Sequence, residues 1–236
     1  MLNNNLLALV ITLIVSVVWL RIIDFAAHRG WIESKLSRKI IHIGTGPLFV
    51  LCWLLFQNTA SARYLAAIVP LLITVQFFLI GVGVIKDDAS VQAMSRTGNP
   101  REILFGPLFY GIIFVLLTIL YWYDSPIGMV ALMVLCGGDG FADIVGRRFG
   151  KSKLPWANSK SWAGSLGMFA GGWVTATLII IIFTALGHLR GSFTDYLLPL
   201  FIINLAATIV ESLPIEDLDN ITITITSVLL GHLLIM

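Results

Sequence analysis

The chain has 236 residues, of which 58% are apolar and only 12% are charged. Its mean hydropathy is +0.93. A soluble domain is typically about 45–50% apolar and about 25% charged, so the composition excludes a disordered chain and an ordinary water-soluble enzyme. The net charge of +2 does not suggest a nucleic-acid partner. Cys52 and Cys136 lie in apolar runs, without the spacing of a disulfide framework or a zinc site.

A helix needs about 20 mostly apolar residues to cross the hydrocarbon core of a bilayer. Eight segments are candidates for such spans. They are Leu6–Ile23, Ile40–Phe56, Ala62–Ile85, Ile103–Tyr123, Pro126–Gly138, Gly164–Leu186, Phe193–Val210 and Ile221–Met236. We therefore expect an all-α, polytopic integral membrane helical bundle with about seven or eight transmembrane helices. Residues 1–236 are expected to form one domain.

Three of these segments depart from the usual pattern. Leu6–Ile23 lacks the basic region and the cleavage site of a signal peptide, so it is predicted to be a span. Pro126–Gly138 is short but continues into the polar stretch Gly137–Asp143, which predicts a helix that carries polar groups. Ile221–Thr226 alternates apolar and polar residues as a strand does. We predict a helix there, because an open strand in lipid leaves backbone groups unpaired.

The distribution of Lys and Arg predicts the orientation in the membrane. With eight spans, thirteen of the fifteen Lys and Arg fall in the odd-numbered loops and their borders. The other side has only Arg63 and Arg190. Basic loops stay on the cytoplasmic side, so we predict that the N-terminus is outside and that the odd-numbered loops are cytoplasmic.

The stretch from Gly138 to Lys151 is the strongest candidate for chemistry. Asp139 and Asp143 are four residues apart, so on a helix they share a face and repel one another. Carboxylates beside a membrane span are costly unless they are paired. Mg²⁺ would resolve both problems, because it binds one or two carboxylates together with phosphate oxygens. The alternative is a helix end in which Asp143 pairs with Arg147.

The same stretch offers further candidates for binding phosphate or nucleotide. They are glycines, which permit close approach, and cations: Gly138, Gly140, Gly146, Arg147, Arg148 and Lys151. The next stretch, Asn158–Ser165, begins a span. We expect Ser159, Lys160 and Ser161 at a helix N-terminus, where backbone N–H groups favour an anion, and Lys160 adds a point charge for a phosphate. The alternative is a basic flank with serine capping. Three nearby glycines are predicted to pack helices closely, namely Gly164, Gly167 and Gly171.

Two other regions carry candidate site residues. The second span begins with Arg38-Lys39-Ile40-Ile41-His42, in which Arg38 and His42 share a helical face. These residues predict a phosphate contact or a proton acceptor; the alternative is a basic flank and a helix-packing histidine.

In the seventh span, Asn204, Thr208 and Glu211 form a polar stripe that is expected to face the bundle interior. The stripe ends at an acidic loop. Asp217, Asp219 and Asn220 either hold a second metal, or position a hydroxyl, or form a merely solvated loop. The candidate metal ligands are Glu211, Asp217 and Asp219.

At these motifs the chain resembles the membrane-bound polyprenol kinase family, which includes phytol kinase and dolichol kinase. The matching elements are Ser37–Gly44, Arg101–Leu108, Gly138–Gly150, Lys160–Ser165 and Glu211–Pro214 with Asp217, Asp219 and Asn220. The third and fourth elements are the most specific. One departure lies in the acidic loop, where Leu218 separates two acids that are adjacent in the family.

The resemblance implies an enzyme that transfers a phosphoryl group from CTP, with Mg²⁺, to a prenyl alcohol such as phytol, farnesol or geranylgeraniol. It implies a multi-pass protein of a bacterial cytoplasmic membrane, or of a thylakoid or other plastid-type membrane, whose partners are the bilayer, the alcohol and the nucleotide. In this interpretation Asp139 and Asp143 hold Mg²⁺, and Lys160 neutralises triphosphate charge together with Arg147, Arg148 and Lys151. His42, or an acid of the 211–219 loop, accepts the alcohol proton.

Two alternatives remain at this stage. The first is a cytidylyltransferase that acts on a lipid phosphate, because the same core looks like that of CDP-diacylglycerol synthase. Ser161 and Ala163 depart from that enzyme's pattern, which has Thr and Glu there. The second is a cation-coupled transporter, which would have ionisable groups through the depth of the membrane. Here they gather at one predicted face, which argues against it.

Overall fold

The computed structural model describes residues 2, 4–95, 97–214 and 218–235. Among these residues, seven helices are long and apolar enough to cross a membrane. They are Asn5–Ala27, Leu36–Leu55, Ala62–Gly81, Pro100–Leu120, Pro126–Phe149, Trp162–Ala185 and Phe193–Glu211. A shorter apolar helix covers Asp219–Leu234. This segment alternates apolar and polar residues as a strand does, but it is helical, as expected from the need to pair backbone groups in lipid. The predicted all-α bundle is confirmed.

The chain divides into two compact units, and the second helix contributes to both. The first unit is Met1–Ile41 with Cys52–Leu120, and the second is His42–Leu51 with Tyr121–Met236. The expectation of one domain over residues 1–236 stays a prediction.

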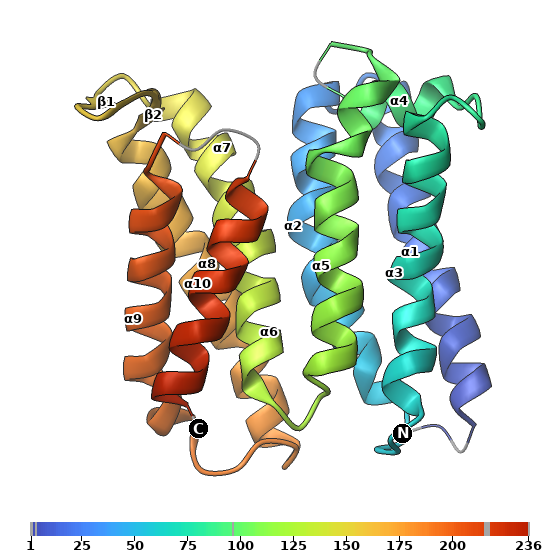
Figure 1. Ribbon diagram of the computed structural model, residues 1–236, viewed down its shortest axis with the longest axis vertical. Coiled ribbons are helices and arrows are strands. Elements are labelled where there is room, and N and C mark those ends of the chain that lie inside the picture. Colours follow the sequence, from blue (N-terminus) through green and yellow to red (C-terminus); the bar gives the residue numbers. More distant parts are fainter. Residues whose placement is uncertain (1, 3, 96, 215–217, 236) are drawn as a thin grey trace. The chain divides into compact units, whose positions relative to one another are not determined.

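The first unit is organised around α3, which packs against α5 and α1 (Figure 1). Its elements are α1 (Asn5–His28), the start of α2 (Ser34–Cys52), η1 (Trp53–Leu55), α3 (Ala62–Gly81), α4 (Asp88–Met94), η2 (Pro100–Leu104) and α5 (Gly106–Leu120). The short helix α4 lies between the third and fourth predicted spans, where the sequence predicted no helix, whereas η2 leads into the predicted span Ile103–Tyr123. The side chain of Asp87 caps α4 by accepting a hydrogen bond from the Ser90 N–H at 3.0 Å. The hydrogen bond that the Ser90 hydroxyl donates to Asp87, together with this backbone bond, holds the pKa of Asp87 below its usual value.

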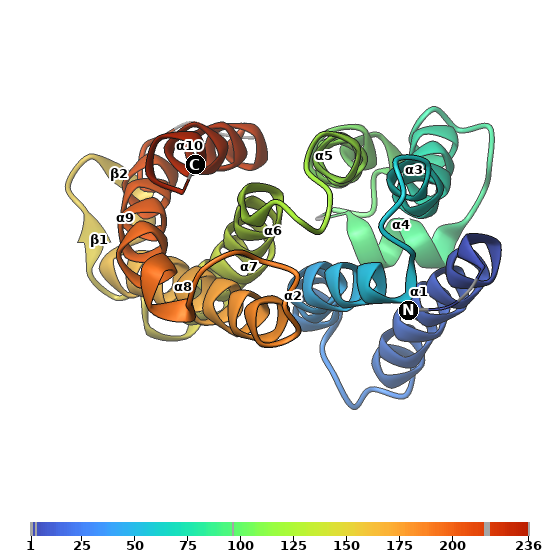
Figure 2. The ribbon, with the colours of Figure 1, turned by 90° about the horizontal axis from the view of Figure 1, so that it is seen from below.

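The second unit contains the end of α2 and the whole C-terminal half of the chain. Its other elements are α6 (Pro126–Met133), η3 (Val134–Gly138), α7 (Asp139–Phe149), β1 (Lys153–Leu154), β2 (Ala157–Ser161), α8 (Trp162–Ala185), α9 (Phe193–Glu211) and α10 (Asp219–Leu234). α8 packs on α7, η3, α6 and α9, and α10 packs on α9 and α6. Figure 2 shows α8, α9 and α10 following one another around α6 and α7.

A two-stranded hairpin lies between α7 and α8, and the sequence did not predict it. β1 and β2 are antiparallel, with Lys153 opposite Ser161 and Leu154 opposite Ala157. The Trp162 N–H donates to the Ser152 carbonyl at 3.2 Å and closes the hairpin at the start of α8. The hairpin lies outside the apolar spans, and its strands satisfy backbone groups of the connection by pairing with one another.

Candidate active site

The fifth span is one helix, Pro126–Phe149, interrupted by a π turn. It is the most buried of the seven spans, since 72% of the residues in its most apolar stretch are buried. The π turn is η3, Val134–Gly138, and all five of its residues are buried. Asp139 follows this turn directly, and Asp143 comes one helical turn later, so both carboxylates project from one face of α7. The continuation of the helix into the polar stretch is therefore confirmed.

Each of these two acids has a cationic or hydrogen-bonding partner. The Nε2 atom of His42 lies 3.3 Å from Oδ2 of Asp139, and the two side chains are 16% and 20% exposed. Nε of Arg147 donates to Oδ1 of Asp143 at 2.9 Å, and the Arg147 side chain is 48% exposed. An exposed pair of this spacing stabilises a helix by about 0.3–0.5 kcal/mol. It is weak enough to be exchanged for a stronger cation contact.

Lys160 lies in a strand rather than at a helix start, contrary to expectation. It belongs to β2, and α8 begins only at Trp162. Ser161 is the N-cap of α8, where its Oγ accepts a hydrogen bond from the Gly164 N–H at 3.1 Å. The pairing of Ser161 with Lys153 holds this segment extended up to the cap.

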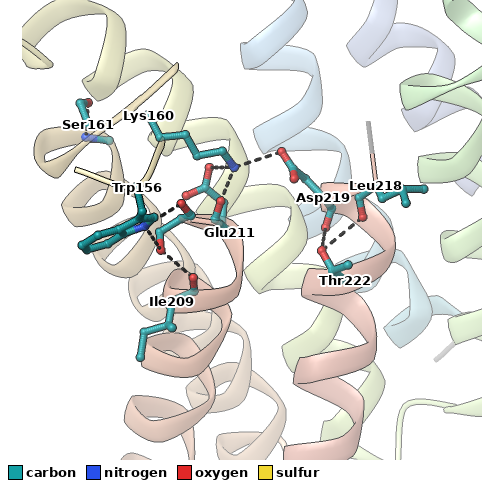
Figure 3. Close-up of polar contacts among 10 residues, drawn as sticks. Trp156, Lys160, Ser161, Ile209, Glu211, Leu218, Asp219 and Thr222 are labelled. Atoms are coloured by element: carbon teal, nitrogen blue, oxygen red, sulfur yellow. Dashed lines mark hydrogen bonds and ion pairs between the residues drawn. The ribbon is translucent and has the colours of Figure 1, made fainter. Parts of the chain in front are cut away.

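Figure 3 shows Lys160 reaching from the hairpin to the ends of two helices. Its Nζ atom lies 2.8 Å from Oε1 of Glu211, the last residue of α9, and 3.2 Å from Oδ2 of Asp219, the first residue of α10. Nζ also donates to the backbone carbonyl of Glu211. Burial alone would lower the pKa of Lys160, but the hydrogen bond and charge of Glu211, with those of Asp219, outweigh it and raise the pKa above its ordinary value. Lys160 is therefore held as a cation.

Two of the predicted acidic residues, Glu211 and Asp219, thus contact this lysine. Glu211 is buried, and the charge of Asp139 acts on it together with those of Lys160 and Asp219. We call His42, Asp139, Lys160, Glu211 and Asp219 the central cluster; its residues come from α2, α7, β2, α9 and α10. Asp217 lies outside the described residues. Within residues 2, 4–95, 97–214 and 218–235, there is no group of three or more His, Cys, Asp or Glu side chains that could hold a metal ion.

The polar stripe on α9 leads to this cluster and faces the interior, as predicted. Asn204 and Thr208 are 1% and 9% exposed, although both are polar. The Thr208 hydroxyl donates to the Asn204 carbonyl at 2.7 Å, and the Asn204 amide donates to the Leu200 carbonyl at 2.7 Å. Bonds back to the preceding turn satisfy these donors without a partner helix.

The glycines predicted to contact nucleotide lie at contacts between helices. A Cβ on Gly138 would come within 2.7 Å of Sδ of Met168, and one on Gly146 within 3.3 Å of Cα of Gly164. A Cβ on Gly140 would overlap the side chain of Ile43. These positions serve close packing in the structure, and their contact with nucleotide stays a prediction. The predicted packing role of three glycines of α8 is confirmed, since each faces α7 or η3: Gly164, Gly167 and Gly171.

The remaining predicted residues are exposed or belong to the first unit. Lys151 and Ser159 are exposed in the connection between α7 and α8. Arg148 is exposed, and its guanidinium lies 5.7 Å from the ring centre of Phe149. Arg38 and Lys39 precede His42 in α2 and fall in the first unit. Their roles stay predictions.

Two features of this region escaped the sequence analysis. Nε1 of Trp156, at the tip of the hairpin, donates to the Ser212 carbonyl at 3.0 Å and ties the hairpin to the end of α9 (Figure 3). The Leu135 carbonyl, within the π turn, lies 3.3 Å from Nε2 of His42. Neither feature has a sequence signal, because a two-residue strand and a single π turn leave no periodic pattern.

Comparisons with known proteins give relatives over most of the chain. A probable phytol kinase, chloroplastic, from Zea mays is 41% identical over 216 residues, which are 91% of this chain and 71% of that protein. Phytol kinase 1, chloroplastic, from Arabidopsis thaliana is 39% identical over 207 residues, 87% of this chain and 68% of that protein. Farnesol kinase, chloroplastic, from Arabidopsis thaliana is 43% identical over 208 residues, which are 87% of this chain and 67% of that protein.

No protein-family model and no solved structure matches the chain. These three relatives are nevertheless 39–43% identical to the chain over 87–91% of its length. They are named as kinases of the family that the motifs around Asp139 and Lys160 resemble. The chain therefore belongs to the polyprenol kinase family of membrane-bound lipid-alcohol kinases.

Proposed function

We propose that this protein phosphorylates a prenyl alcohol with CTP at the cytoplasmic face of the membrane. The observation that carries the proposal is the central cluster. In it Lys160 pairs with Glu211 and Asp219 at the ends of α9 and α10, and the charge of Asp139, from the fifth span, acts on Glu211. The relatives named phytol kinase and farnesol kinase support a prenyl alcohol as the substrate class. Their designation as chloroplastic favours a plastid-type membrane over a bacterial cytoplasmic membrane.

In the proposed reaction, the alcohol oxygen attacks the γ-phosphorus of CTP. A bond forms between these two atoms, and the bond from the γ-phosphorus to the oxygen that bridges it to the β-phosphorus breaks. CDP leaves with that oxygen, and the alcohol proton passes to a carboxylate of the central cluster. Phosphoryl transfer of this kind depends chiefly on positioning and on charge stabilisation. The side chains of the cluster are of the types that supply both.

Lys160 is the residue we assign to the phosphates of the nucleotide. An ammonium is a compact charge suited to phosphate oxygens, and Glu211 and Asp219 keep it charged and fix its position. We assign Glu211 and Asp219 to holding Lys160, which differs from their predicted role as metal ligands. Arg147, Arg148 and Lys151 lie at or just past the end of α7 and add positive charge around the triphosphate.

The residues present also fit a Mg²⁺ ion. Asp139 and Asp143 share one face of α7 and are both partly exposed, with side chains 20% and 25% accessible. Two carboxylates, completed by phosphate oxygens and water, are a common donor set for Mg²⁺. When bound, the ion would neutralise charge on the transferring phosphate. Asp139 and Asp143 are the residues that would hold it.

The proposal is tested in membranes that contain the purified protein. CTP, ATP, UTP and GTP are each combined with phytol, farnesol and geranylgeraniol, and the products are separated. We expect prenyl monophosphate and CDP in equal amounts, with CTP as the best donor. Membranes that carry the Asp139→Asn variant are the matched control. Release of pyrophosphate in the presence of a lipid phosphate, without any reaction of the alcohols, would instead identify a cytidylyltransferase.

A further inference from the structure

The imidazole of His42 lies between two oxygen atoms of the fifth span. Nε2 is 3.3 Å from the backbone oxygen of Leu135 and 3.3 Å from Oδ2 of Asp139. The side chain is only 16% exposed. The first oxygen belongs to the π turn and the second to the residue directly after it. A single ring nitrogen therefore faces a main-chain carbonyl and a carboxylate at the same time.

Both neighbours of Nε2 are hydrogen-bond acceptors. A carbonyl oxygen has no proton to give, and an ionised carboxylate only accepts. A hydrogen on Nε2 suits this arrangement, because a bare ring nitrogen would repel both oxygens. The side of the ring that faces Asp139 is therefore placed to orient the carboxylate.

The π turn is what creates this pair of acceptors. A π turn shifts the hydrogen bonding of a helix from the fourth residue to the fifth, and such turns occur frequently at functional sites. In η3, this shift occurs over residues that are fully buried, including Leu135 and Cys136. The α-helix resumes at Asp139. The π turn therefore determines the direction, around the helix axis, in which the Asp139 carboxylate projects towards the imidazole.

Close packing of α2 on the fifth span fixes the imidazole in this position. A Cβ on Gly46, one turn beyond His42, would lie 2.8 Å from Cβ of Cys136 within the π turn. A Cβ on Gly140, next to Asp139, would overlap the side chain of Ile43, next to His42. Glycines on both sides of the contact thus let the two helices approach at the level of the cluster, and all these residues belong to the second unit.

We propose that His42 is a positioning residue, which orients the Asp139 carboxylate as a metal and phosphate ligand, and that it is not the proton acceptor of the reaction. The proposal rests on the proposed function and assigns a role within the same site. It replaces the interpretation of His42 as a base. Partners that orient a metal ligand typically change metal affinity or activity by about 10–100-fold when they are lost.

The test compares two substitutions that separate donation from basicity. His42→Gln keeps an N–H donor at similar reach but has no basic nitrogen. His42→Phe keeps a ring of similar shape but has no donor. A positioning role predicts that His42→Gln retains kcat within about threefold, whereas His42→Phe loses about 10–100-fold in kcat. KM for the prenyl alcohol should stay unchanged in both, because His42 acts through Asp139. If His42→Phe does not fold, as judged by its melting temperature, His42→Leu takes its place.

A second measurement does not depend on turnover. Mn²⁺ alone is titrated into the purified protein, and unbound Mn²⁺ is followed by electron paramagnetic resonance. We expect His42→Phe to weaken Mn²⁺ binding about tenfold or more, and His42→Gln to leave it close to that of the wild type. Asp139→Asn, which removes a proposed ligand, is the matched reference for loss of binding.

Two results would overturn the proposal. If His42→Gln is as inactive as His42→Phe while both bind Mn²⁺ like the wild type, His42 is the proton acceptor. If neither substitution changes kcat or Mn²⁺ affinity, His42 only packs the helices. If the wild-type protein phosphorylates no alcohol, the proposed function fails, but the Mn²⁺ titration still decides whether His42 orients Asp139.

Discussion

Replacing Lys160 with Met removes one ammonium group from two carboxylates and keeps an unbranched side chain. Nζ lies 2.8 Å from Glu211 and 3.2 Å from Asp219, and the Lys160 and Glu211 side chains are only 16% and 10% exposed. Removing one partner of a buried ion pair costs about 3–5 kcal/mol, because the other charge stays buried without compensation. Since Asp219 is 29% exposed and partly solvated, we expect the lower end, about 3 kcal/mol.

The assay is thermal unfolding in detergent. For a chain of this size, 1 kcal/mol corresponds to about 2–4 °C in melting temperature, so Lys160→Met should melt about 6–12 °C below the wild type. The pKa of Lys160 is raised, so its stabilisation is complete below the pKa of an unpaired lysine, about 10.4. It disappears as the pH rises through the higher folded-state value. On the alkaline side, the difference in melting temperature should therefore persist up to about pH 9.

The double variant Lys160→Met with Glu211→Gln is the control, because it also removes the buried charge that the single variant leaves behind. It should recover part of the lost stability, with a coupling of about 1–3 kcal/mol. In the kinase assay, loss of a charge-assisted phosphate contact worth about 1.5–3 kcal/mol lowers the rate roughly ten- to a hundredfold. A Lys160→Met protein with wild-type melting temperature and kinetics would refute both roles of this lysine.

Three further predictions follow from other contacts. Asp143→Asn should lower activity by orders of magnitude with partial recovery at high Mg²⁺, and it should leave the melting temperature within a few degrees, since the pair with Arg147 is exposed; a large loss of stability without recovery by Mg²⁺ would make the pair structural. Gly171→Ala should destabilise the protein by about 1–3 kcal/mol, because the added Cβ lies 2.6 Å from the Gly137 carbonyl oxygen, and an unchanged melting temperature would contradict the packing. A cysteine at Ser152 should react with reagents applied from the cytoplasm and one at Asn58 from outside; labelling of both from the same side would contradict the orientation.

The spans could be predicted from the sequence because a bilayer imposes a strict requirement. Each crossing needs a long apolar run with all its backbone groups paired internally, so hydropathy alone located the helices. The same rule correctly identified α10 as a helix despite its strand-like alternation. The candidate site residues were recognisable for a related reason. Charged and polar groups beside a span are costly unless they have a role, which drew attention to Asp139, Asp143 and Glu211.

The pairing of these residues could not be predicted, because it depends on contacts between distant parts of the chain. The sequence placed Lys160 at a helix start, whereas the β1–β2 hairpin places it in a strand whose side chain reaches Glu211 and Asp219. Local composition carries no information about a partner more than fifty residues away. For the same reason, the role of His42 depends on the tertiary structure. Only the packing of α2 on the π turn decides that its Nε2 faces two acceptors, and therefore that it donates hydrogen there.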